Sequence, residues 1–227
     1  MTKSKHRIIY MVLGILLSTI ILLTSIQWIA FNIGHYKRSF EKYNISAETG
    51  MDKENLEYVM RDLLAYLRDE REVLDTRAVV KGKEREVFGE RERLHMIDVK
   101  ELFIKGEMIR NISLLLLGAL MVFLIFTDNL WKRNLSKILL YTSIGNLLLL
   151  GLFLVLIYFD FNRYFTYFHL IFFDNDLWIL DPETEILIQM VPEGFFYDTA
   201  RKIISIFIGS MGASGALGYI SLQKKKA

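Results

Sequence analysis

Four stretches of the chain lack charged residues, and they cover residues 8–33, 112–127, 138–159 and 203–222. A membrane-spanning helix needs about 20 mostly apolar residues, and three of the four runs reach that length. The run 112–127 is shorter, but apolar residues between 99 and 109 have the spacing of a helix face that continues into it. The pattern therefore predicts an all-α polytopic membrane protein with four transmembrane helices, in a single integral membrane domain over residues 1–227.

The short flanks of these runs are basic. They hold Lys3, Lys5 and Arg7 before the first run, Lys132, Arg133 and Lys137 between the second and third, and Lys224, Lys225 and Lys226 at the end, against one acid, Asp128. Because cytoplasmic flanks carry an excess of Lys and Arg, both termini are predicted to be cytoplasmic and the loops 35–110 and 160–202 extracytoplasmic. A cleaved signal peptide is disfavoured for the first run, which is too long and has no small-x-small cleavage site after it.

The two extracytoplasmic loops are predicted to form a mostly helical cap. Apolar residues recur at helical spacing from 52 to 67, which predicts an amphipathic helix on the membrane surface or over the bundle. Residues 78–88 indicate a short hairpin around Lys81-Gly82-Lys83. Asp181-Pro182-Glu183 indicates a helix start, Pro192 its interruption, and Glu193 the start of a second helix that runs into the last span.

Polar and small residues inside the spans predict contacts between helices. Glycines 209, 212, 215 and 218 stand among serines and alanines in the last span, which is typical of close helix packing. We expect this face to pack within the chain rather than against a second copy, and the protein to be a monomer. Thr142, Ser143 and Asn146 in the third span would form hydrogen bonds between helices.

Composition and missing motifs exclude several classes of function. The chain has 28 Lys and Arg against 26 Asp and Glu, a net charge of +2, and no Cys. No disulfide or thiol nucleophile is therefore available. The near-neutral charge speaks against nucleic acid as a partner. Walker, G-x-S-x-G and H-E-x-x-H motifs are missing, so the common nucleotide, hydrolase and zinc signatures do not apply. No cofactor is expected.

Two of the four histidines are candidates for catalysis, whereas His6 and His35 belong to the flanks of the first span. His95 shares a helix face with Asp98, and a carboxylate that accepts from one ring nitrogen leaves the other as a base. His169 lies among apolar and aromatic residues, where burial would keep it neutral near pH 7. Alternatively, His95 lies on a solvated helix face, and His169 is a structural histidine at the membrane interface. Both histidines are predicted at the same membrane boundary, which favours a shared site.

A metal site is a further alternative. His95, Asp98 and His169, with one of Asp174, Asp176 or Glu193, supply suitable ligand types. No pair among them has a familiar metal-binding spacing, so no metal is expected.

At these positions the chain resembles the bacterial lipoprotein intramolecular transacylases, membrane enzymes of Gram-positive bacteria. The resemblance rests on three motifs: His95-Met96-x-Asp98-Val99-Lys100; Phe168-His169-x-x-Phe172-Phe173 with Asn175, Asp176 and Trp178; and Pro192-Glu193-x-Phe195-Phe196. It implies transfer of the sn-2 acyl chain of a lipoprotein's diacylglyceryl cysteine onto that cysteine's own α-amino group, which gives the lyso form. The substrate would be a diacylated lipoprotein in the cell membrane, and His95 and His169 would be the catalytic residues.

The residues fit this chemistry. An O-to-N acyl shift needs a neutral amine, a stabilised oxyanion and a proton for the departing glycerol oxygen, and two histidines would divide or share these tasks. Supporting roles are expected for Asp98, which would orient His95, for Lys100 and Asn175, which would donate to the oxyanion, and for Glu193. Aromatic residues that would line an acyl-chain groove, or form a plain interfacial belt, are Phe168, Phe172, Phe173 and Trp178.

The sequence is also compatible with two other functions. One is a non-enzymatic membrane accessory protein that docks a partner through the helix at 52–67, and the other is a metal-dependent membrane hydrolase. The division of acid and base between the histidines, the preferred lipoproteins and the structure of the loop 69–91 are not indicated by the sequence.

Overall fold

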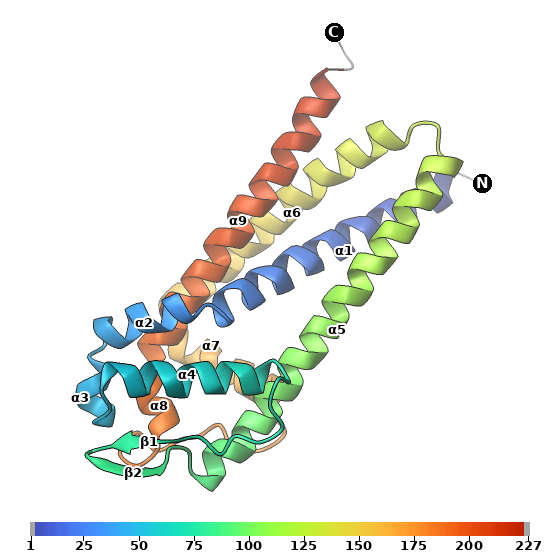
Figure 1. Ribbon diagram of the computed structural model, residues 1–227. Coiled ribbons are helices and arrows are strands. Elements are labelled where there is room, and N and C mark those ends of the chain that lie inside the picture. The colour runs from blue at the N-terminus through green and yellow to red at the C-terminus, as the bar shows by residue number, and fades with distance from the viewer. Residues whose placement is uncertain (1–2, 225–227) are drawn as a thin grey trace. The chain divides into compact units, whose positions relative to one another are not determined.

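The computed structural model describes residues 3–224, without the side chains of residues 3–5, 153 and 155–159. Lys225 and Lys226, which entered the topology prediction, lie outside the described residues, as do the side chains of Lys3 and Lys5. The described chain is mostly helical, with one two-stranded sheet (Figure 1). Its elements are α1 (Lys3–Ala30), α2 (Ile33–Lys42), α3 (Ile45–Thr49), α4 (Lys53–Leu67), β1 (Arg77–Val80), β2 (Lys83–Glu86), α5 (Glu90–Thr127), α6 (Trp131–Phe159), α7 (Phe161–Phe172), α8 (Ile186–Met190) and α9 (Glu193–Gln223).

Four helices are long and apolar enough to cross a membrane, which confirms the predicted number of spans. They are His6–Ala30 in α1, Glu90–Thr127 as α5, Trp131–Leu152 in α6 and Glu193–Gln223 as α9. Within α5, charged residues recur up to Arg110 and are absent from 111–127, so the membrane-spanning part begins after Arg110. Residues 90–106 of α5 belong to a different compact unit from residues 107–127.

The first span ends three residues earlier than its apolar run predicts. Helix α1 stops at Ala30, and Asn32 takes an extended conformation (φ −91°, ψ 97°) as the N-cap of α2. The apolar run continues because Phe31 packs against Phe103 of α5, with ring centroids 5.0 Å apart, and not because the helix does. The apolar residues after Ala30 therefore reflect packing in the core of unit 2 and not a longer helix.

The chain divides into two compact units, and unit 1 (1–27, 107–160 and 201–227) holds the spans. Tyr10 donates a 2.8 Å hydrogen bond to Asp128, which joins the start of α1 to the turn between α5 and α6. The amide of Asn146 donates to the Ser18 hydroxyl at 2.8 Å, as expected of polar groups between membrane helices. These bonds fix the register of α1 against its neighbours.

The small residues of α9 pack against α6 within unit 1. The Ser143 hydroxyl donates to the Met211 carbonyl at 2.7 Å. A Cβ on Gly218 would lie 2.5 Å from the Ser136 carbonyl oxygen, so only glycine permits this approach. Gly212 faces open space. Part of the predicted face therefore packs within the chain.

Unit 2 (28–106 and 161–200) is built around α4. Leu56, Val59 and Met60 of α4 are fully buried in its hydrophobic core, and Asp52 caps the helix by accepting from the Asn55 amide at 2.8 Å. The amphipathic helix predicted at 52–67 is thus present, and its apolar face packs into the core of unit 2.

The predicted hairpin is present as β1 and β2, paired antiparallel with Val80 opposite Lys83. Lys81 (φ 52°) and Gly82 (φ 77°) form its two-residue turn with positive φ at both positions, the geometry that matches strand twist. The helix predicted at Asp181 is wrong. The Asp181 carboxylate accepts from the Glu183 amide at 3.0 Å and the Thr184 hydroxyl at 2.9 Å, which makes a turn, and the helix begins only at Ile186. The helix predicted from Glu193 into the last span is α9.

Candidate functional site

His95 on α5 and His169 on α7 lie side by side in unit 2. Their ring centroids are 6.4 Å apart and each residue is 8% exposed. The two residues are far apart in sequence, so the fold of unit 2 alone brings them together. The structure therefore unites the two histidines that sequence reasoning selected.

The hydrogen bond of His169 identifies its tautomer. Its Nδ1 lies 2.7 Å from the Phe165 carbonyl oxygen, one turn earlier in α7. A carbonyl can only accept, so Nδ1 carries the proton and Nε2 holds the lone pair of a base. Burial lowers the pKa of His169, although the bond to Phe165 opposes the shift. His169 is consequently a neutral imidazole at pH 7.

Trp178 holds the His169 ring from one face. The two rings stack at 4.6 Å with an interplanar angle of 23°. Phe165 contacts the same imidazole edge to face at 4.5 Å. Hydrogen bond and ring contacts together fix the direction of Nε2.

His95 has an unsatisfied buried nitrogen. Its Nδ1 is inaccessible to solvent and makes no hydrogen bond to the described residues. Burial, helped by the neighbouring His169 and Arg91, lowers the pKa of His95 to about 4, against the opposing charge of Asp98. Phe173 packs edge to face on the ring at 5.3 Å. A buried polar atom without a hydrogen-bond partner costs free energy. Such atoms, and histidines with a strongly shifted pKa, are found preferentially at functional sites.

The loop after α7 is attached to the same face of α5. The Asn175 amide donates to the Asp98 carboxylate at 2.9 Å, and the Trp178 indole donates to the Asn175 carbonyl at 3.0 Å. Arg91 donates to the backbone carbonyls of Asp176 and Ile179. These bonds position Trp178, and through it His169.

Arg91 was not selected from the sequence. A signal existed, because Arg91, His95 and Asp98 recur at the spacing of one helix face. It donates to two backbone carbonyls and pairs with the Asp176 carboxylate at 3.4 Å, and the carbonyl contacts leave no trace in a side-chain motif.

Two expected supporting contacts are different in the structure. In the described residues Asp98 bonds to Asn175 and makes no hydrogen bond to His95. The Lys100 ammonium pairs with Asp69 at 2.7 Å and donates to the Arg71 carbonyl at 2.8 Å. Lys100 therefore anchors the loop after α4, and the role of oxyanion donor does not fit its contacts.

Glu193 and Asn175 also form hydrogen bonds near the histidines. Glu193 accepts from the Asn162 amide at 3.2 Å, which links the start of α9 to the start of α7. The side-chain oxygen of Asn175 accepts from the Leu177 amide at 3.0 Å. Both residues shape the backbone near the histidines.

A buried acid next to the site was missed. Glu92 is 2% exposed, and its carboxylate accepts from the backbone amides of Leu187 at 2.6 Å and Gly89 at 2.5 Å. It thus caps α5 and holds the start of α8. Burial raises the pKa of Glu92, and the two amides oppose the shift.

The aromatic residues expected in an acyl groove divide into two sets. Phe173 is buried against the histidines, whereas Phe168 and Phe172 are exposed on α7. Leu170 and Ile171 are exposed beside them, so α7 presents a broad apolar surface next to His169. Such a surface suits contact with lipid chains.

The described residues contain no group of three or more His, Asp or Glu side chains arranged to hold a metal ion. The ligand set considered from the sequence is therefore not assembled. What the site offers is two adjacent neutral imidazoles, one with a defined basic nitrogen, in an apolar setting. This is suited to moving a proton during acyl transfer.

Comparison with solved structures gives the same fold. The lipoprotein intramolecular transacylase Lit from Bacillus cereus is 21% identical, with a TM-score of 0.79 over 99% of both chains. Two variants of that protein with a histidine replaced, by alanine and by arginine, are each 22% identical with TM-scores of 0.77 over 97% of this chain and 94% and 93% of theirs. A search of curated protein sequences gave no significant match.

The sequence profile of one family, described as "Lipoprotein intramolecular transacylase Lit", matches residues 11–196. This range includes both histidines, the loop that carries Trp178 and the start of α9. The protein is a multi-pass membrane protein that belongs to the lipoprotein intramolecular transacylase family.

Proposed function

We propose that this protein moves the sn-2 acyl chain of a lipoprotein's diacylglyceryl cysteine onto the α-amino group of the same cysteine. The observation that carries the proposal is the pair of buried histidines, 6.4 Å apart, with a free basic nitrogen on His169. Membership of the transacylase family supports acyl transfer within a lipoprotein.

In the first step the neutral α-amine attacks the ester carbonyl carbon, and a C–N bond forms. His169 Nε2 accepts the proton that the nitrogen loses. The amine has a reference pKa of about 7.7–8.0, so a neutral imidazole is a sufficient base near pH 7. The developing oxyanion accepts a hydrogen bond from the N–H of His95, as neutral histidines do in other enzymes.

In the second step the tetrahedral intermediate collapses. The C–O bond to the glyceryl oxygen breaks, and the proton held by His169 passes to that oxygen. The products are an amide and a free hydroxyl, so no co-reactant is consumed. Because both groups belong to one molecule, alignment supplies much of the rate, with effective molarities up to roughly 10⁵–10⁸ M.

We also propose that the site is extracytoplasmic and both termini cytoplasmic. The support is the basic character of the turn between α5 and α6 and of the chain ends. The Tyr10–Asp128 hydrogen bond puts the start of α1 beside that turn, as this topology requires. The substrate's acyl chains would then enter from the outer leaflet along the exposed apolar residues of α7.

The test is tandem mass spectrometry of the N-terminal lipopeptide of a reporter lipoprotein, expressed with this protein in a host that cannot N-acylate lipoproteins. Intact mass does not change in an intramolecular shift, so fragment ions must locate the chains. We expect one acyl chain on nitrogen and the remaining glyceryl ester at sn-1. A free amine, despite folded protein in the membrane, would refute the proposal.

Two variants test whether both histidines are required. His95→Ala and His169→Ala should each leave the diacylglyceryl form unconverted. His35→Gln is the matched control, because His35 is buried in unit 2 and bonded to Thr199, outside the site. Loss of activity in all three variants would indicate a structural effect.

A further inference from the structure

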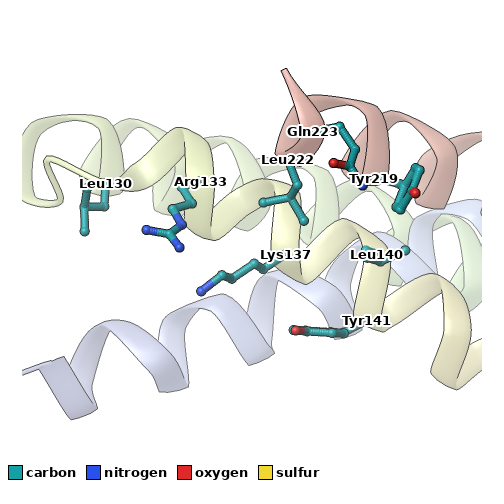
Figure 2. A pocket seen from close by; sticks show the side chains of 8 residues that line it. All are labelled: Leu130, Arg133, Lys137, Leu140, Tyr141, Tyr219, Leu222 and Gln223. Atoms are coloured by element: carbon teal, nitrogen blue, oxygen red, sulfur yellow. The ribbon is translucent and has the colours of Figure 1, made fainter. Parts of the chain in front are cut away.

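A pocket of about 610 Å³ lies in unit 1, whereas the two histidines belong to unit 2. It is lined from α6 and the turn before it by Leu130, Arg133, Lys137, Leu140 and Tyr141, and from the end of α9 by Tyr219, Leu222 and Gln223 (Figure 2). Its volume is in the range of about 300–1,000 Å³ that is usual for ligand sites. None of the steps of acyl transfer uses it.

The pocket holds two uncompensated cations. Among the described residues neither Arg133 nor Lys137 makes an ion pair or hydrogen bond, and Figure 2 shows both extending from the same side of α6. Asp128 is the one acid in the adjoining turn, and it is occupied by Tyr10, Asn134 and the Leu130 amide. Arg133 is exposed and Lys137 half-buried, so both are accessible to an anionic ligand at this pocket.

The surface beyond the cations is apolar. Arg133, Lys137 and Tyr141 recur at intervals of four on α6, and the same face continues through Ile144 and Leu148, both exposed. The basic start of α6 thus leads directly into its uncharged part, at the level where phosphate headgroups meet hydrocarbon. An isolated phosphate would use the cations alone, whereas a phospholipid would use both parts.

We propose that this pocket binds one anionic phospholipid. Its phosphate is held by Arg133 and Lys137, with the hydroxyls of Tyr141 and Tyr219 available as donors to the headgroup. One acyl chain lies along the exposed face of α6. Basic pockets between membrane helices recognise anionic headgroups in this way. The site is separate from the transacylation proposed above and does not depend on it.

The test is a titration of the detergent-purified full-length protein with phosphatidylglycerol, followed by native mass spectrometry. Arg133→Gln and Lys137→Gln should each weaken binding about 5-fold, and the double variant about 30-fold. Lys132→Gln combined with Lys224→Gln is the matched control, because it removes two exposed cations from the same boundary outside the pocket. Its affinity should be within about 2-fold of the parent.

A second variant blocks the pocket without changing charge. Leu222→Trp fills the space between α6 and α9 and should abolish binding while Arg133 and Lys137 remain. Equal losses in the charge variant and its control would show diffuse attraction and overturn the proposal. So would equal affinity for phosphatidylcholine, undiminished binding to Leu222→Trp, or displacement of the lipid by inorganic phosphate at low millimolar concentration, which would show a free-phosphate site.

Discussion

Glu92 provides the sharpest test of how unit 2 is held together. Replacing it with alanine removes the acceptor of two backbone amides, those of Leu187 and Gly89. The Leu187 amide is buried and would have no partner in its place. The Gly89 residue is exposed, so water can replace the lost bond there.

The magnitude follows from these two environments. A buried donor left unsatisfied costs about 1–3 kcal/mol, and a hydrogen bond lost to solvent about 0.5–1.5 kcal/mol. The free energy of unfolding should therefore fall by about 1.5–4.5 kcal/mol, centred near 3. For a chain of this length, 1 kcal/mol shifts the melting temperature by about 2–4 °C. The central value of about 3 kcal/mol therefore corresponds to a fall of roughly 6–12 °C.

The assay is thermal unfolding of the purified protein in one detergent, followed by circular dichroism. Glu92→Gln retains one acceptor oxygen and should lose about half as much as Glu92→Ala. Glu90→Ala is the control, since Glu90 is an exposed acid in the same first turn of α5. Its effect should stay within about 1 kcal/mol. If Glu92→Ala melts together with Glu90→Ala, the carboxylate does not hold α8 to α5.

Four further outcomes are expected. Burial lowers the pKa of both site histidines, so their neutral forms persist below the pH at which a free imidazole takes up a proton. For His95, whose pKa is lowered to about 4, the stability that depends on the neutral form is full above pH 6.5 and is lost as the pH falls from 6.5 toward about 4. The rate of acyl transfer should accordingly rise through pH 7.7–8.0, where the substrate amine loses its proton, and a sole inflection near 6.5 in the rate profile would contradict this. Trp178→Ala should lower kcat about 2- to 13-fold by removing the stack on His169, with recovery in Trp178→Phe, as measured by single-turnover assay. Asp98→Asn keeps an acceptor for Asn175 and should retain more turnover than Asp98→Ala; equal losses would show that the negative charge itself is needed. Gly218→Ala should destabilise the protein by about 1–3 kcal/mol through its clash with the α6 backbone, whereas Gly212→Ala, which faces open space, should be neutral or stabilising, and thermal unfolding separates the two.

Much of the fold could be predicted from the sequence because its signals are local. Absence of charge predicted the spans, period 3.6 predicted α4, and Lys81-Gly82 predicted the hairpin turn. The start of α9 at Glu193 followed from the preceding proline. The turn at Asp181 was predicted as a helix because an Asx-turn and an N-cap place the same residue types at the same spacing.

The site was only partly predictable, since its decisive contacts join distant segments. The two histidines share a motif with a known family, and they meet in the structure. The roles of Arg91 and Glu92 depend on backbone groups about 90 residues away in the chain. Lys100 was chosen by its position in a motif, but its nearest counter-charge, Asp69, lies in a turn whose shape the sequence did not reveal.

The division of unit 2 between two stretches of chain has a consequence for how the protein is made. Residues 28–106 carry His95, and residues 161–200 carry His169 and the apolar residues Ile186, Leu187 and Met190 that complete the core around α4. Membrane-spanning parts of α5 and α6 separate the two stretches in the order of synthesis. A nascent chain therefore exposes the larger part of this core, formed by residues 28–106, until its third span has been inserted and the following loop has emerged. The two candidate histidines come together only when the fold of unit 2 is complete, so a chain truncated before residue 161 would expose its apolar core residues to proteolysis.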